Sequence, residues 1–211
     1  MLLHKIINTL SRTLGTGNAP LQVAGDDELH STYPKLDKYR AAAVLLPLVM
    51  VDGEVHVILI ERGAELEHHP SQISFPGGRV DDSDVDIIAT ALREAQEEIA
   101  LPPSAVQVLG TLPLYPTRTG FMITPVVGAL QEMPTIVLDP NEVASSFTMP
   151  LSFFADFNNR TIDSLEFDGF THQFFVYETP HGRVWGAAAG ILISLVRAVQ
   201  SEAPVEYAKV I

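Results

Sequence analysis

The 211-residue chain contains no cysteine. That absence excludes disulfide bonds, a thiolate nucleophile and cysteine-ligated zinc. Long apolar runs are also missing. No stretch approaches the ~20 apolar residues of a membrane-spanning helix, and the N-terminal residues lack the apolar core and small-residue cleavage site of a signal peptide. We therefore expect a cytoplasmic protein with no membrane partner.

Basic residues are scarce, because 13 Lys and Arg stand against 26 Asp and Glu, for a formal net charge of −13. An acidic surface repels a polyanion, so nucleic acid is excluded as a partner. A small phosphorylated substrate remains compatible with this charge, since bound divalent cations reverse the local field. Apolar residues make up 46% of the chain, which is enough for an ordinary core.

The pattern of apolar residues predicts one α/β (α+β) domain, with a mixed β-sheet sandwiched between helices. Residues 1–35 are interpreted as an N-terminal helix and a linker rich in Gly, Asp, Ser and Pro. Residues 36–200 form the main domain, and residues 201–211 a C-terminal tail. We expect the N-terminal helix to pack on protein, the alternative being a helix that lies on a membrane surface.

Asp52-Gly53 separates two apolar runs and predicts a β-hairpin. The Ala/Leu-rich segment over residues 184–199 predicts a buried helix, which Trp185 would anchor in the core; stacking of Trp185 on an adenine ring is the alternative. The remaining expected elements are strands over residues 41–50, 55–60, 106–112, 121–130 and 173–178, a helix over 87–99 and a short helix over 142–147.

The helix predicted over residues 87–99 carries three carboxylates, Glu94, Glu97 and Glu98, on one side. Carboxylates this close repel each other unless a cation lies among them, and oxygen ligands are those that Mg²⁺ and Mn²⁺ prefer. Arg93 can hold Glu97 across one turn. A merely solvated acidic face is the alternative. A different side, formed by Ile88, Leu92, Ala95 and Ile99, is expected to face the core.

The residues before this helix favour the cation site. In Gly77-Gly78 no Cβ intervenes, so backbone carbonyls can come close to a ligand. Acidic residues then precede the helix, and carboxylates near the N-terminal end of a helix interact favourably with its dipole. These acidic residues are Asp81, Asp82, Asp84 and Asp86.

Gly78 and residues 93–101 (Arg-Glu-Ala-Gln-Glu-Glu-Ile-Ala-Leu) resemble the Nudix box, a glycine and an acidic residue followed by Arg-Glu-apolar-x-Glu-Glu-x-Gly-apolar. The resemblance implies the Nudix fold and hydrolysis of a nucleoside diphosphate linked to another moiety. Two departures stand out. The spacing from Gly78 to Arg93 is one residue longer than in the common form of the box. The upstream glutamate of the box has no clean counterpart in this chain, and Asp84 is the nearest acidic residue to its position. Ala100 replaces the usual glycine, and Pro102-Pro103 can end the helix instead.

Residues 58–78 are similar to a further motif, that of the coenzyme A diphosphatase branch of the Nudix hydrolases. The similarity extends over roughly residues 40–195 and implies coenzyme A or acyl-coenzyme A as substrate. Another nucleoside diphosphate derivative (an ADP-sugar, a dinucleotide or an oxidised nucleotide) is the alternative, followed by a non-catalytic module that senses a nucleotide. Arg62, Leu66, His69, Gln72 and residues 73–78 match the motif, whereas Ile60, Gly63 and Ser71 depart from it.

The resemblance also implies roles. Glu94 and Glu98 would be the principal ligands of Mg²⁺ or Mn²⁺, with Glu97 and the Gly78 carbonyl as further ligands. Glu97 and Glu142 are alternative general bases, and Arg93 supports the catalytic carboxylates. Family analogy alone suggests a homodimer. The predicted substrate-binding residues are Arg62, His69, Gln72, Ser74, Phe75 and Arg79. The alternatives are a strand-end salt bridge for Arg62, a loop histidine without a ligand for His69, and packing of the turn for Phe75.

Overall fold

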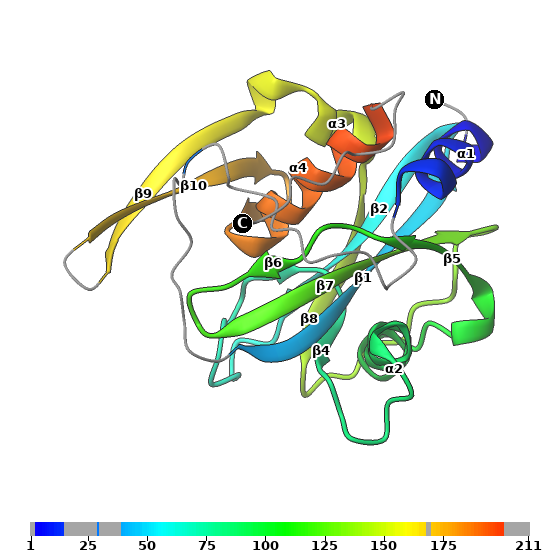
Figure 1. Cartoon of the computed structure of the whole chain (residues 1–211), viewed down its shortest axis with the longest axis horizontal. Coiled ribbons are helices and arrows are strands. Elements are labelled where there is room, and N and C mark those ends of the chain that lie inside the picture. Colours follow the sequence, from blue (N-terminus) through cyan, green and yellow to red (C-terminus); the bar gives the residue numbers. More distant parts are fainter. Residues whose placement is uncertain (1–2, 15–28, 30–38, 168–169, 201–211) are drawn as a thin grey trace, which may run out of the picture.

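The computed structural model describes residues 3–14, 29, 39–167 and 170–200, coloured along the chain in Figure 1. The predicted linker and C-terminal tail lie almost wholly outside the described residues. The helices are α1 (Leu3–Thr13), α2 (Ile87–Ile99), α3 (Leu151–Ala155) and α4 (Ala187–Gln200), with 3-10 turns at Pro103–Ala105 and Phe157–Asn159. The strands are β1 (Arg40–Val51), β2 (Glu54–Arg62), β3 (Ile73–Ser74), β4 (Gly77–Arg79), β5 (Val106–Thr111), β6 (Tyr115–Pro116), β7 (Phe121–Leu130), β8 (Val143–Pro150), β9 (Arg160–Phe167), β10 (Phe170–Thr179) and β11 (Gly182–Trp185).

Within these residues, eight strands form one mixed sheet in the order β3-β2-β1-β7-β5, to which β4, β6 and β8 are paired. The β1–β7 pair is parallel. The predicted β1–β2 hairpin is confirmed, since Asp52 (φ 48°) and Gly53 (φ 85°) both take the left-handed conformation that a two-residue hairpin turn requires. A second, antiparallel sheet has the order β11-β10-β9, and its β9–β10 ribbon projects from the body (Figure 1).

Helices cover both faces of the mixed sheet. The α2 helix lies on one face, and α1, α3 and α4 lie on the other (Figure 1). Ile6 and Leu10 of α1 are almost fully buried, and α1 packs against α4 and β5, so the prediction of a packing helix is confirmed. No helix in the described part of the chain is long and apolar enough to cross a membrane.

The short helix expected over residues 142–147 is wrong, because these residues enter β8. This strand pairs antiparallel with β2 from Arg62↔Val143 to His56↔Pro150. A helix there would leave the outer edge of β2 without hydrogen-bond partners, and the tertiary pairing overrides the local pattern.

The expected helix over residues 184–199 starts too early. Val184 and Trp185 belong to β11 and pair with Tyr177 and Val176 of β10. Gly186 then takes a left-handed conformation (φ 59°), and α4 begins at Ala187. Trp185 is half-buried beside Phe174, with 5.2 Å between ring centroids, so it belongs to the second sheet and does not anchor a helix.

The C-terminal end of α2 has the backbone conformation that a glycine usually adopts at a helix end. Ala100 is left-handed (φ 53°, ψ 30°). The N–H of Ala100 donates to the Gln96 carbonyl at 3.1 Å, and that of Leu101 to the Ala95 carbonyl at 3.2 Å. The expected ending at Pro102-Pro103 is therefore wrong, because Ala100 itself reverses the chain at the cost of an unfavourable backbone conformation.

Ala100→Gly is expected to raise the free energy of unfolding by about 0.5–1 kcal/mol. The left-handed conformation costs a non-glycine residue roughly 1–2 kcal/mol, part of which is offset by the larger entropy that glycine loses on folding. Urea denaturation measures the change. Ala89→Gly, in the right-handed part of the same helix, is the matched control and should lower stability by about 1 kcal/mol. A loss of stability in Ala100→Gly as well would contradict the prediction.

Candidate active site

The candidate site lies where β2 diverges from β1. The second half of β1 pairs with β2, whereas its first half pairs with β4 on the same side. Gly77 and Gly78 therefore lie opposite Val44 and Ala43, and the Pro76 carbonyl accepts from the Leu45 N–H at 2.9 Å. This arrangement inserts the Gly-Gly turn into the sheet beside the end of β2, directly under α2.

Glu98 is the buried carboxylate of the site, with 1% of its side chain exposed. One oxygen accepts from the Gly77 N–H at 2.9 Å, and the other lies 3.6 Å from Arg62 Nη1. Burial raises the pKa of Glu98 to about 8, in spite of these two favourable partners. The expectation that Glu98 lies away from the core side of α2 is wrong, since it is buried on the same side as Ala91 and Ala95.

Metal-free protein is expected to lose stability as the pH rises from about 4.5 to about 8. The pKa of Glu98 is about 8 in the folded protein, above its usual value of 4.5, so in this window the unfolded chain releases a proton that the folded chain retains. The contribution of Glu98 to the free energy of unfolding therefore falls by at most about 1.4 kcal/mol per pH unit. Urea denaturation in EDTA measures this slope. Glu98→Gln is the control and should lack it; equal slopes in the two proteins would contradict the assignment.

Glu94 lies against the glycine turn. A Cβ atom at Gly78 would stand 2.5 Å from both carboxylate oxygens of Glu94, so only glycine leaves room for that side chain. Burial is the main reason that the pKa of Glu94 is raised, and the negative charges of Glu97 and Glu142 raise it further. One turn of α2 thus brings Glu94 and Glu98 to the Gly-Gly turn.

Arg93 is the centre of an ion-pair network. As predicted, it bonds Glu97, at 2.8 Å, and it also contacts Glu94 at 2.9 Å. Asp84 receives two hydrogen bonds from Arg93, at 2.9 and 3.0 Å, which hold the pKa of Asp84 well below its usual range. The Arg79 carbonyl accepts another at 3.0 Å. Asp84 therefore fixes the arginine, which in turn orients two carboxylates.

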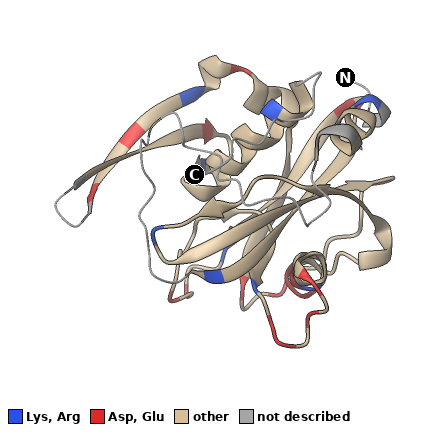
Figure 2. Ribbon diagram, in the orientation of Figure 1, with Lys and Arg blue, Asp and Glu red and all other residues tan. Residues whose placement is uncertain are grey.

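The donor set fits a hard divalent cation. Among the described residues, no three acidic or histidine side chains already converge as they would around a metal ion, because Arg93 holds Glu97 and one oxygen of Glu94. The Glu94 and Glu98 carboxylates nevertheless lie at a turn that a Cβ would fill, and oxygen donors suit Mg²⁺ and Mn²⁺. Figure 2 shows acidic residues gathered on α2 and on the loop before it.

Two buried polar atoms of this region lack a partner in the described part of the chain, Nε of Arg62, which contacts Glu98, and Oγ of Ser74. Ser74 pairs with Ile60, two residues before Arg62, and the Arg62 N–H donates to the Gln72 carbonyl at 3.0 Å. Because cross-strand partners share a sheet face, Ser74 faces the α2 side with Arg62. Buried polar groups are costly unless hydrogen-bonded, so these atoms favour a bound polar ligand here.

The other predicted residues lie around this centre. Phe75 is 3% exposed and packs in the core beneath the turn. His69 is exposed, and its Nδ1 lies 2.9 Å from Gln72 Oε1. Glu142 lies on the exposed loop before β8, and its carbonyl accepts from the Gly63 N–H at 2.8 Å.

Two residues of this region, Arg40 and Phe121, were not among the predicted site residues. They lie beside Arg79 in the structure. Phe121 falls within the similarity to the coenzyme A diphosphatase branch, but no local pattern predicts that it meets Arg40, because the pairings of β1 with β4 and with β7 bring these residues together from distant parts of the chain.

A mixed sheet with a carboxylate-bearing helix over a glycine turn defines a Nudix-type α/β domain. The model of the NUDIX domain matches residues 38–152, and the chain belongs to the Nudix hydrolase family. It is 42% identical over 156 residues to proteins named "Uncharacterized Nudix hydrolase NudL" from Citrobacter koseri and Cronobacter sakazakii, covering 74% of this chain and 81% of each relative.

Solved structures similar to this chain have lower identity. A MutT/nudix family protein from Enterococcus faecalis has a TM-score of 0.49 at 16% identity, covering 82% of this chain and 68% of that one. The NUDIX domain of Shewanella oneidensis NrtR, complexed with ADP ribose, has a TM-score of 0.44 at 20% identity, covering 60% and 82%.

Proposed function

We propose that this Nudix hydrolase cleaves the diphosphate bond of coenzyme A or acyl-coenzyme A. The products are 3′,5′-ADP and 4′-phosphopantetheine or its acyl form. The proposal rests on the segment that resembles the coenzyme A diphosphatase motif, because that segment supplies the contacts around Glu98. Arg62 lies 3.6 Å from Glu98, the Gly77 N–H bonds it, and Ser74 Oγ is buried without a partner in the described residues.

The departures from that motif do not touch these contacts. Ile60 is fully buried in the core cluster under α2. Gly63 packs against the backbone of Glu142, and Ser71 is exposed with a left-handed backbone (φ 55°). They therefore leave the arrangement of the carboxylates and of Arg62 intact.

Glu94, Glu98 and the Gly78 carbonyl would hold Mg²⁺ or Mn²⁺, with Glu97 as a further ligand. When bound, such a cation would neutralise phosphate oxygens and lower the pKa of a bound water. Arg62 and Ser74 would donate hydrogen bonds to the diphosphate, since both have a buried polar atom free for it. His69, Gln72 and Arg79 would bind the substrate at the rim.

Glu142 is the better candidate for the general base. Its negative charge contributes, after burial, to the raised pKa of both Glu94 and Glu98, so it acts on the same site as these two carboxylates. Its side chain has no hydrogen bond or ion pair with the described residues, whereas Glu97 is held by Arg93. We expect Glu142→Gln to lower kcat by roughly 100-fold, and Glu97→Gln to lower kcat less. Steady-state kinetics with saturating Mg²⁺ measure both, and the reverse order would assign the proton transfer to Glu97.

A substrate panel tests the proposed function. Purified protein is incubated with Mg²⁺ or Mn²⁺ and with coenzyme A, acetyl-coenzyme A, NADH, ADP-ribose or diadenosine polyphosphates, and products are identified by mass. We expect 3′,5′-ADP and phosphopantetheine, with kcat/KM for a coenzyme A substrate above that of every other compound. Glu98→Gln, purified in parallel, controls for contaminating hydrolases. Faster hydrolysis of another compound would assign that substrate instead, and no hydrolysis of any would favour the nucleotide-sensing alternative.

A further inference from the structure

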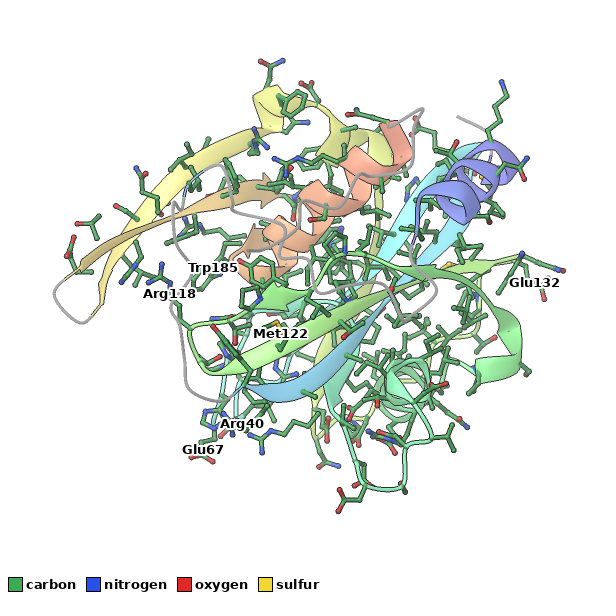
Figure 3. The ribbon with its side chains drawn as sticks, viewed as in Figure 1. Arg40, Glu67, Arg118, Met122, Glu132 and Trp185 are labelled. Carbon is green, nitrogen blue, oxygen red and sulfur yellow. The ribbon has the colours of Figure 1, made fainter. Side chains whose placement is uncertain are left out.

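Two arginines flank one aromatic ring beside the Gly-Gly turn. The guanidinium carbon of Arg40 lies 4.1 Å from the centroid of Phe121, and that of Arg79 lies 5.2 Å from the same centroid. Phe121 pairs with Arg40 across the β1–β7 ladder, and Arg79 pairs with Ala42 across the β1–β4 ladder. Figure 3 shows Arg40 at the start of β1, at the same end of the sheet as the labelled Met122. We call Arg40, Arg79 and Phe121 the arginine–phenylalanine cluster.

No structural role accounts for the two charges. Neither Arg40 nor Arg79 forms an ion pair with a carboxylate in the described part of the chain, although acidic residues outnumber basic ones two to one. By contrast, Arg62, Arg93 and Arg183 each have a carboxylate partner. Stacking on an aromatic face orients a guanidinium but leaves its in-plane N–H donors available. Arg40 uses one such group, Nη2, for the Thr119 carbonyl at 3.2 Å.

The cluster begins one residue from the carboxylate site. Arg79 directly follows Gly78, and consecutive Cα atoms are about 3.8 Å apart. The Arg79 carbonyl is bonded by Arg93, which fixes the backbone at this point. Gly78 pairs with Ala43 and faces α2, whereas Arg79 pairs with Ala42 and faces the opposite side of the sheet. A ligand bound under α2 can therefore extend across the sheet edge at Gly78 to reach both guanidinium groups.

We propose that the arginine–phenylalanine cluster binds a second phosphate group of the substrate, a phosphate monoester carried by the ribose. This inference rests on the proposed function and deepens it. A dianionic phosphate offers oxygens that two guanidinium groups can bind together, each through paired N–H donors. In coenzyme A, only the ribose separates the 3′-phosphate from the diphosphate, which matches the close spacing of the cluster and the carboxylates along β4. Phe121 is a positioning residue, because it holds both side chains by stacking.

Kinetic discrimination between coenzyme A and 3′-dephospho-coenzyme A tests the proposal. We expect wild-type protein to prefer coenzyme A in kcat/KM, and Arg40→Gln or Arg79→Gln to lower that preference at least about tenfold, mainly through KM. Phe121→Leu should lower it less, since both charges remain. Arg183→Gln, which removes an exposed guanidinium of the second sheet, is the matched control and should keep the wild-type ratio. An unchanged ratio in both cluster variants overturns the inference while leaving the proposed function standing.

A binding measurement separates the two hypotheses. Calorimetric titration with 3′,5′-ADP and with 5′-AMP measures how much the 3′-phosphate adds to binding affinity, and it does not depend on catalysis. Tighter binding of 3′,5′-ADP by wild-type protein, lost in Arg40→Gln and retained in Arg183→Gln, supports the cluster even if coenzyme A is not hydrolysed. Equal affinity of wild-type protein for the two nucleotides overturns the inference, whatever the substrate panel shows.

Discussion

Glu98→Gln is expected to lower kcat for diphosphate hydrolysis by at least about 100-fold without unfolding the domain. Glutamine has the same shape and can still accept the hydrogen bond from the Gly77 N–H. It cannot supply the negative charge with which the buried Glu98, 1% exposed, would hold the proposed divalent cation. Removal of the buried charge also removes its desolvation cost, so the metal-free variant should be at least as stable as wild type near pH 8.

Three measurements on one preparation check this expectation: initial rates at saturating Mg²⁺, calorimetric titration with Mn²⁺, and urea denaturation. Glu67→Gln, an exposed carboxylate in the loop before β3, is the matched control and should retain activity. Full activity of Glu98→Gln would remove this residue from the reaction. Lost activity together with a lower free energy of unfolding would assign it a structural role.

Gly78→Ala should lower activity by about 100-fold or more, while Gly77→Ala should strongly destabilise the fold. The new Cβ at Gly78 would stand 2.5 Å from the Glu94 carboxylate, which is the end of a flexible side chain and can move away. At Gly77 the Cβ would meet the Ala43 carbonyl at 2.4 Å and Val44 Cα at 2.6 Å, which are backbone atoms of the central strand. That strand cannot yield without breaking the β1–β4 pairing.

The two substitutions differ by a single position and control for each other. Circular dichroism and urea denaturation measure the fold, and steady-state kinetics measure the site. We expect Gly78→Ala to remain within about 1 kcal/mol of wild type, and Gly77→Ala to lose at least about 3 kcal/mol. Wild-type activity in Gly78→Ala would show that Glu94 does not need its place at the turn.

Local signals in the sequence were sufficient for the β1–β2 hairpin and for α2. Asp52-Gly53 specifies its own turn, because both residues tolerate positive φ. The α2 helix has a capping residue, Asp86, whose side chain accepts from the Ala89 N–H at 2.7 Å. The Arg93–Glu97 pair follows from helical spacing alone. These features depend on residues within one or two turns of each other.

Features that depend on sheet pairing could not be predicted from local signals in the sequence. The burial of Glu98 follows from the divergence of β1 and β2, which no helical wheel contains. In β9 the apolar Ile162 and Leu165 do not alternate strictly and are exposed, so the strand has no amphipathic pattern. The cluster at Phe121 joins residues 40, 79 and 121, and its geometry exists only once β1 lies between β4 and β7.

Arg93 gives the protein a built-in counter-ion. Its guanidinium group already neutralises part of the negative charge of α2, with contacts to Glu94, Glu97 and Asp84. Arg93 therefore offsets the repulsion among the carboxylates of α2 without a bound cation. Binding of the proposed cation would then require the Glu94 and Glu97 side chains to turn away from Arg93, on a backbone that stays in place.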